Sequence, residues 1–110
     1  MGNRATVIIQ ETNVCLYTHW NRNKIEETVI KSLKRGKDRW YDSAYLARII
    51  FSDMIEGQEK ELSGFGISTE YNNEEFYIII KPDLSVIVTD PDNNEVRYYN
   101  SFSEYIEEKI

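Results

Sequence analysis

The sequence contains few of the residues from which covalent cross-links and metal sites are built. Its 110 residues include one cysteine, Cys15, and one histidine, His19. A single cysteine excludes both an intramolecular disulfide and a cysteine-based zinc site. No second histidine exists to form a His-x-His pair, and no Glu-x-x-His spacing occurs. We therefore expect neither a metal site nor a cofactor.

Long apolar runs are missing as well. No stretch is long and hydrophobic enough to cross a membrane, and residues Met1–Arg4 show no signal-peptide pattern. A length of 110 residues corresponds to one domain, residues 1–110. We expect a single cytoplasmic domain without a membrane partner.

Charge is distributed unevenly along the chain. The first 55 residues contain nine Lys/Arg and six Asp/Glu, whereas the last 55 contain four and thirteen, and the formal net charge is −6. This asymmetry indicates one basic and one acidic side. The excess of acid disfavours direct nucleic-acid binding, which requires a basic face. Ordinary solvated surface is the better explanation for most of these charges.

Alternating hydrophobic residues and turn residues predict the order of the elements. An N-terminal hairpin precedes two amphipathic helices, and strands joined by tight turns then lead to a short C-terminal helix. We expect a two-layer α+β domain with a mainly antiparallel sheet of five to six strands and the two central helices on one face. The clearest predicted strands span residues 5–9, 14–20, 76–81, 85–89 and 95–99, and the predicted helices span 24–35, 43–56 and the residues after 101.

Capping residues mark the predicted helix ends. Asn23, with Glu26 three residues later, is predicted to begin the first central helix, and Gly36 to end it. Asp42 or Ser43 is predicted to begin the second. The capping signals therefore agree with the hydrophobic pattern on where both helices lie.

Residues 14–21 form the stretch in which chemistry-bearing side chains are most concentrated. On a strand, Tyr17 and His19 share one face, whereas Trp20 belongs to the other, more apolar face. Because residues 5–9 and 14–20 are expected to pair as a hairpin, Arg4 should lie beside His19. The alternative is that His19 and Trp20 simply complete a core strand, and general burial tendencies favour this alternative for each residue taken alone.

A binding pocket requires rings for stacking and cations or amides for an anion. Arg4 and Arg48 are candidate phosphate ligands, and Trp20 is a candidate stacking residue. We assign no catalytic residue: Cys15 and His19, four residues apart on one strand, are separated by roughly 13 Å at ~3.3 Å per residue, too far for a catalytic dyad. The full set of candidate ligand-binding residues is Arg4, Tyr17, His19, Trp20, Asn21, Lys24, Tyr45 and Arg48.

Three segments, 2–5, 16–21 and 45–50, carry a resemblance to a known group of sequences. They resemble small uncharacterised proteins of phages and bacterial mobile elements, in which Gly-Asn-Arg-Ala precedes a Tyr-x-His-Trp-Asn strand end and a later helix contains Ala-Arg. The resemblance covers about the first half of the chain, and Arg22 replaces a glycine of that pattern. It implies a phage context, in which small acidic proteins often counter host defence from the host cytoplasm, but it implies no activity.

These observations lead to a choice between two kinds of function. The first hypothesis is a non-enzymatic, phage-type counter-defence protein that sequesters a small anionic, nucleotide-like signalling ligand. The alternative is an acidic inhibitor whose second half, including Glu70, Glu74 and Glu75, occludes a host defence protein and could act as a nucleic-acid mimic. A third and weaker hypothesis is a phosphodiesterase or nuclease that uses His19. A homo-oligomer is compatible with the first hypothesis, because two copies of a small domain can enclose a pocket.

Overall fold

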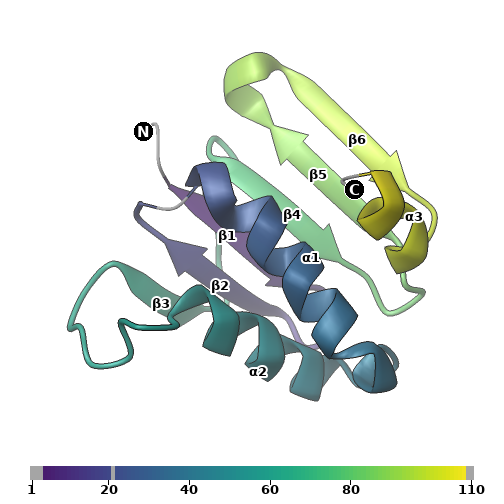
Figure 1. Cartoon of the computed structure of the whole chain (residues 1–110). Helices are drawn as coiled ribbons and strands as arrows, with labels where there is room; N and C mark the ends of the chain where they lie inside the picture. Colours follow the sequence, from purple (N-terminus) through teal and green to yellow (C-terminus); the bar gives the residue numbers. More distant parts are fainter. Residues whose placement is uncertain (1–3, 21, 109–110) are drawn as a thin grey trace.

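Residues 4–20 and 22–108 are described by the structure, a computed structural model. They form one six-stranded sheet with three helices on one face (Figure 1). The expected α+β fold, with two central helices and a short C-terminal helix, is confirmed. The elements are β1 (Ala5–Ile9), β2 (Val14–Thr18), α1 (Ile25–Arg35), α2 (Ser43–Met54), β3 (Phe65–Ser68), β4 (Phe76–Ile80), β5 (Val86–Asp90), β6 (Glu95–Tyr99) and α3 (Phe102–Glu108).

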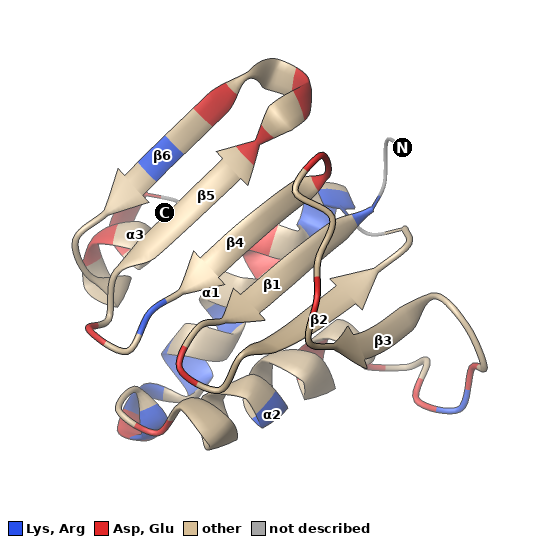
Figure 2. Cartoon of the chain, turned by 180° about the vertical axis from the view of Figure 1, so that it is seen from behind, with Lys and Arg blue, Asp and Glu red and all other residues tan. Residues whose placement is uncertain are grey.

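The sheet is mixed because one parallel pair lies at its centre. The strand order is β3-β2-β1-β4-β5-β6, and β1 pairs with β4 in parallel while the other neighbours pair antiparallel. Residues 69–75 leave β3 at the edge and cross the helix-free face, over β2 and β1, before entering β4 (Figure 2). This crossing connection delivers β4 beside β1 in the same direction, which a tight hairpin cannot do.

Alternation along the central strands decides which side chains lie under the helices. In β4, Phe76, Ile78 and Ile80 are buried in the core shared with the helices, whereas Tyr77 and Ile79 point to the opposite face and are partly exposed. The neighbouring strands keep this alternation, so a single core lies between the sheet and the helix layer. None of the described helices is long and apolar enough to span a membrane.

The first central helix begins differently from the prediction. Its apolar stripe, Ile25, Val29 and Leu33, is buried as expected. The predicted cap is wrong: Asn23 lies inside a 3-10 turn (Arg22–Lys24), Lys24 occupies the capping position, and no side chain caps the helix. An N-cap residue has a non-helical backbone, whereas the backbone at Asn23 is already part of the 3-10 turn.

The other predicted helix ends fall close to their expected positions. Gly36 ends α1, and its N–H donates to the Ser32 carbonyl at 2.8 Å. Asp42 caps α2 by accepting from the Tyr45 N–H at 3.3 Å. The helix ends at Met54, two residues before the predicted end at Glu56.

A polar network fastens β6 and α3 to the first turn of α1. Arg97 donates to Glu26 at 2.8 Å and to the Tyr99 hydroxyl at 2.7 Å. Tyr105, a fully buried residue, donates to the same Glu26 carboxylate at 3.0 Å, and Tyr99 donates to Glu108. Glu26 therefore links α1 to β6 and α3, through residues 71 and 79 positions further along the chain.

Candidate ligand-binding site

A cavity of about 470 Å³ opens between α1, the end of α2 and the strands β2 and β3. We call it the α1–α2 cavity. Its apolar side is formed by Ile25, Met54 and Phe65, and polar groups of the two helices line the remainder. The residues that line it are Thr18, Lys24, Ile25, Thr28, Lys31, Asp53, Met54, Glu56, Gln58 and Phe65.

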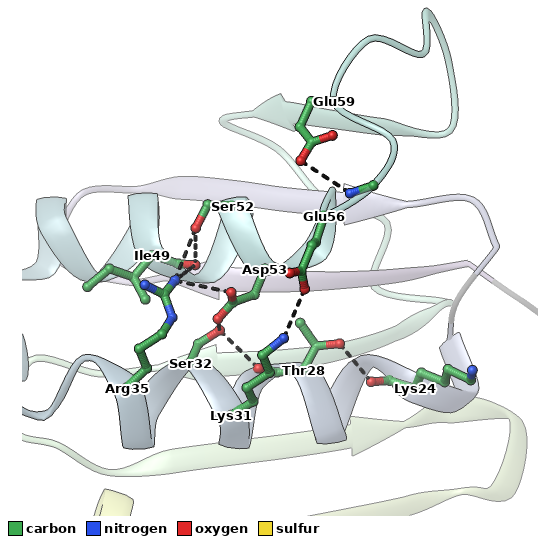
Figure 3. Close-up of polar contacts among 11 residues, drawn as sticks. Lys24, Thr28, Lys31, Ser32, Arg35, Ile49, Ser52, Asp53, Glu56 and Glu59 are labelled. Carbon is green, nitrogen blue, oxygen red and sulfur yellow. Dashed lines mark hydrogen bonds and ion pairs between the residues drawn. The ribbon is translucent and has the colours of Figure 1, made fainter.

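The polar wall on α1 follows from helical spacing. Lys24, Thr28 and Lys31 are separated by four and three residues, which places them on one side of the helix. The Thr28 hydroxyl donates to the Lys24 carbonyl at 3.0 Å, which ties the side chain of Thr28 to the preceding turn. The Lys24 side chain extends away from Lys31 (Figure 3). This wall therefore carries two lysines whose side chains diverge, with the Thr28 side chain between them.

The facing wall comes from the end of α2 and carries carboxylates. Lys31 donates to Glu56 at 2.9 Å, so one ion pair connects the two walls (Figure 3). The hydrogen bond to Glu56 and the charge of that carboxylate raise the pKa of Lys31 above its usual value. Asp53 accepts from the Ser32 hydroxyl at 2.6 Å and from Arg35 at 3.1 Å. Asp53 is thus held by α1, whereas the Glu56 carboxylate is paired, among the described residues, with the exposed Lys31 alone.

Three of the candidate residues, Arg4, Tyr17 and His19, lie next to one another on the helix-free face of the sheet. Tyr17 and His19 stack with ring centroids 5.5 Å apart. Arg4 lines a small hollow of about 130 Å³ with them, as the hairpin register of Ala5 opposite Thr18 requires. The guanidinium of Arg4 lies 3.6 Å from the Glu75 carboxylate. Its charge is therefore partly neutralised within the chain.

Trp20 lies against β3. Its ring covers Gly64, where an added Cβ would come within 2.1 Å of the indole, and it meets Phe65 edge-on with centroids 6.0 Å apart. Gly64 has φ = +98°, which a glycine adopts without strain. Trp20 remains 42 % exposed and supports the Phe65 ring that lines the α1–α2 cavity. Asn21, the next candidate, lies outside the described residues.

The remaining candidates lie elsewhere on the helix layer. Tyr45, at the start of α2, packs under the Arg39 guanidinium at 4.7 Å. It is separated from Met54, at the cavity end of α2, by roughly 13 Å at ~1.5 Å per residue. Arg48 lines a separate apolar groove beside β3. The eight candidates thus fall into several places, because the sheet separates Arg4 and His19 from the helices and α2 separates Tyr45 from the cavity.

Sequence reasoning identified Lys24 but missed the rest of the cavity. The spacing of Lys24, Thr28 and Lys31 was the available signal for the α1 wall. No local pattern pairs Lys31 with Glu56, because their contact depends on how α1 and α2 pack. The one thiol is not part of the cavity: Cys15 is buried in the sheet, and burial raises the pKa of its thiol.

Comparison of the chain with protein-family models, with curated proteins and with solved structures finds no match.

Proposed function

We propose that the protein binds a small anionic, nucleotide-like ligand in the α1–α2 cavity and sequesters it without transforming it. One observation carries the proposal: a cavity of about 470 Å³ combines lysine ammonium groups, hydroxyl groups and an aromatic ring. Small-molecule sites typically measure about 300–1,000 Å³ and combine apolar walls with a few orienting polar groups. The cavity therefore has the size and the mixed lining that a nucleotide requires.

The anionic part of such a ligand is assigned to Lys24 and Lys31. Lys24 forms no ion pair with any residue that the structure describes. Lys31 is paired with Glu56, but the side chains of both are more than half exposed. An exposed pair of this kind contributes little to stability. A phosphate can therefore replace Glu56 as the partner of Lys31 at small cost.

The remainder of the ligand is assigned to the apolar side and to the acceptors at the rim. A flat ring can pack against Phe65, which Trp20 contacts edge-on. Glu56, once released from Lys31, and Gln58 can accept hydrogen bonds from amino groups on that ring. A nucleobase with an exocyclic amine and an attached phosphate satisfies both requirements.

Binding rather than turnover is proposed because of the groups present. The described residues that line the cavity include no histidine, cysteine or tyrosine. Its carboxylates are engaged: Asp53 by Ser32 and Arg35, and Glu56 by Lys31. The resemblance of the first half to small phage proteins supports a host signalling nucleotide as the ligand and counter-defence as the role.

The acidic-inhibitor hypothesis has weaker support. Several carboxylates of the second half are paired within the molecule: Asp90 and Asp92 with Arg22, and Glu75 with Arg4. Acidic residues also lie in separate places on the helix-free side rather than in one continuous row (Figure 2). A mimic of nucleic acid would need unpaired charges at regular spacing.

The proposal is tested by calorimetric titration with AMP, a cyclic dinucleotide and ADP-ribose. Lys24→Ala combined with Lys31→Ala should lower the affinity for the nucleotide that binds by at least tenfold, because two charge-assisted contacts are lost. Lys34→Ala is the matched control, since this exposed lysine of α1 does not line the cavity. Equal affinities for all three proteins would place the ligand elsewhere.

A further inference from the structure

Strand β3 is an edge strand without the charged residues that often protect an edge against pairing. It occupies one end of the sheet, with β2 on its inner side. At the other end, β6 carries Glu95 and Arg97, charged residues of the kind that discourage strand addition. The sequence of β3 is Phe-Gly-Ile-Ser, without a charge. The outer backbone groups of β3 are therefore an open template for another strand.

An apolar groove adjoins this edge on the helix side. It has a volume of about 380 Å³ and lies between α2 and β3, with Phe51 and Ile55 on one side and Ile67 on the other. We call it the α2–β3 groove. Ile67, in the middle of β3, is 62 % exposed. An edge strand without charges and a contiguous apolar surface together mark a contact site.

Strand addition restricts how a second copy can occupy this edge. Directly opposed residues in an antiparallel pair point to the same face of the sheet. Pairing Ile67 with its own counterpart keeps both helix layers on one side and brings the two grooves together. The symmetry is then two-fold, which is the commonest symmetry of homo-oligomers.

Charge complementarity also favours a second copy. The connection before β3, residues 57–63, carries Glu59 and Glu61 against one Lys60, and its Leu62 is fully exposed. Arg48 lines the groove together with Val14. Val14 lies near the C-terminal end of β3, because the next residue, Cys15, pairs with Ser68, the last residue of that strand. Under an antiparallel two-fold axis, the acidic connection of one copy lies toward the Arg48 end of the other. The main contact would be apolar, so two chains of net charge −6 can approach there.

We infer that the protein associates as a two-fold symmetric homodimer through β3 and the α2–β3 groove. Sedimentation at concentrations up to about 1 mM, enough to populate a dimer of millimolar Kd, gives the mass directly. The mass of wild type should rise with concentration from 13.0 kDa toward twice that value. Ile67→Asp should sediment as a monomer. Val96→Asp also replaces a β-branched apolar residue by aspartate, at a 49 % exposed position of the other edge strand, and should remain dimeric.

The register is tested by Ile67→Cys under oxidising conditions. Opposed Cα atoms in an antiparallel pair lie about 4.5–5.5 Å apart, which falls within the Cα separation of about 4.4–6.8 Å found across disulfides. Val96→Cys should not cross-link, and Cys15 is buried in both variants. A monomeric wild type, a dimer that Ile67→Asp leaves intact, or an Ile67→Cys dimer that does not cross-link would overturn the inference. Ile67 does not line the α1–α2 cavity, so Ile67→Asp should bind nucleotide normally whatever its mass.

Discussion

Lys31 on α1 and Glu56 just beyond α2 form an ion pair of 2.9 Å that connects the two walls of the α1–α2 cavity. Glu56 competes with any anion for this lysine. Glu56→Gln should therefore tighten nucleotide binding by about two- to fivefold, a small factor because an exposed ion pair is weak. Calorimetric titration measures this, with Glu59→Gln as the control, because Glu59 does not line the cavity. The amide oxygen of Gln can still accept from the ligand's amino groups, so unchanged or weaker binding by Glu56→Gln would contradict the assignment of Lys31.

The pair of Arg22 and Asp90 should stabilise the protein in a pH-dependent manner. Burial alone would raise the pKa of Asp90, but hydrogen bonds from Asn93 and the charge of Arg22 outweigh it and lower the pKa below 3.8. Because the folded-state pKa is depressed, this stabilisation is present above about pH 4 and is lost as the pH falls through the depressed pKa. Asp90→Asn should cost about 1.5–3 kcal/mol at pH 7, measured by urea unfolding.

The difference between Asp90→Asn and wild type should shrink below about pH 4, since wild type is then protonated as well. Asp92→Asn is the control: it removes the more exposed partner of Arg22 and should cost less than about 1 kcal/mol. A constant gap between Asp90→Asn and wild type from pH 7 to pH 2 would disagree with this account.

Tyr99 should make the protein sensitive to alkali. Burial and the hydrogen bond to Glu108 raise the pKa of Tyr99 to about 12, from an ordinary value of 10.0. The folded state holds the proton more tightly, so this contribution is complete below about pH 10 and is lost as the pH rises toward 12. The stability of Tyr99→Phe should therefore fall less steeply with rising pH over that range, as monitored by circular dichroism. The same change at the exposed Tyr98 should leave the slope unaltered.

The Tyr17 ring leaves no room for a side chain at Gly66. A Cβ at Gly66 would come within 2.2 Å of the ring, so Gly66→Ala must displace Tyr17 from its stack on His19. We expect a cost of about 1–3 kcal/mol in urea unfolding, typical of overpacking. In a Tyr17→Ala background the same change should cost less than about 1 kcal/mol, because the obstructing ring is gone. Equal costs in both backgrounds would show that the ring is not the cause.

The fold was predictable wherever local patterns determine it. The stripe of Ile25, Val29 and Leu33 defined α1, and alternation defined β4. The parallel pairing of β1 and β4 was not predictable, because residues 69–75 carry no signal for crossing the sheet rather than turning at its edge. Asn23 was misassigned because a 3-10 turn occupies the position where a capping residue was expected.

The candidate site was predictable only where it depended on neighbouring strands. The hairpin register placed Arg4 beside His19 correctly. Sequence alone did not reveal that the sheet separates these residues from Lys24. The contact of Lys31 with Glu56 joins residues 25 positions apart and exists only through helix packing.

Native mass spectrometry of the protein purified from cells with an active nucleotide-based defence system tests the central claim most directly. The account predicts an added mass equal to that of a nucleotide, which remains chemically unchanged after long incubation and is absent from the protein in which Lys24→Ala and Lys31→Ala are combined. The same nucleotide should raise the melting temperature, since a ligand at 100 times its Kd stabilises by about 2.7 kcal/mol. An unliganded protein whose melting temperature does not respond to any nucleotide would contradict the account.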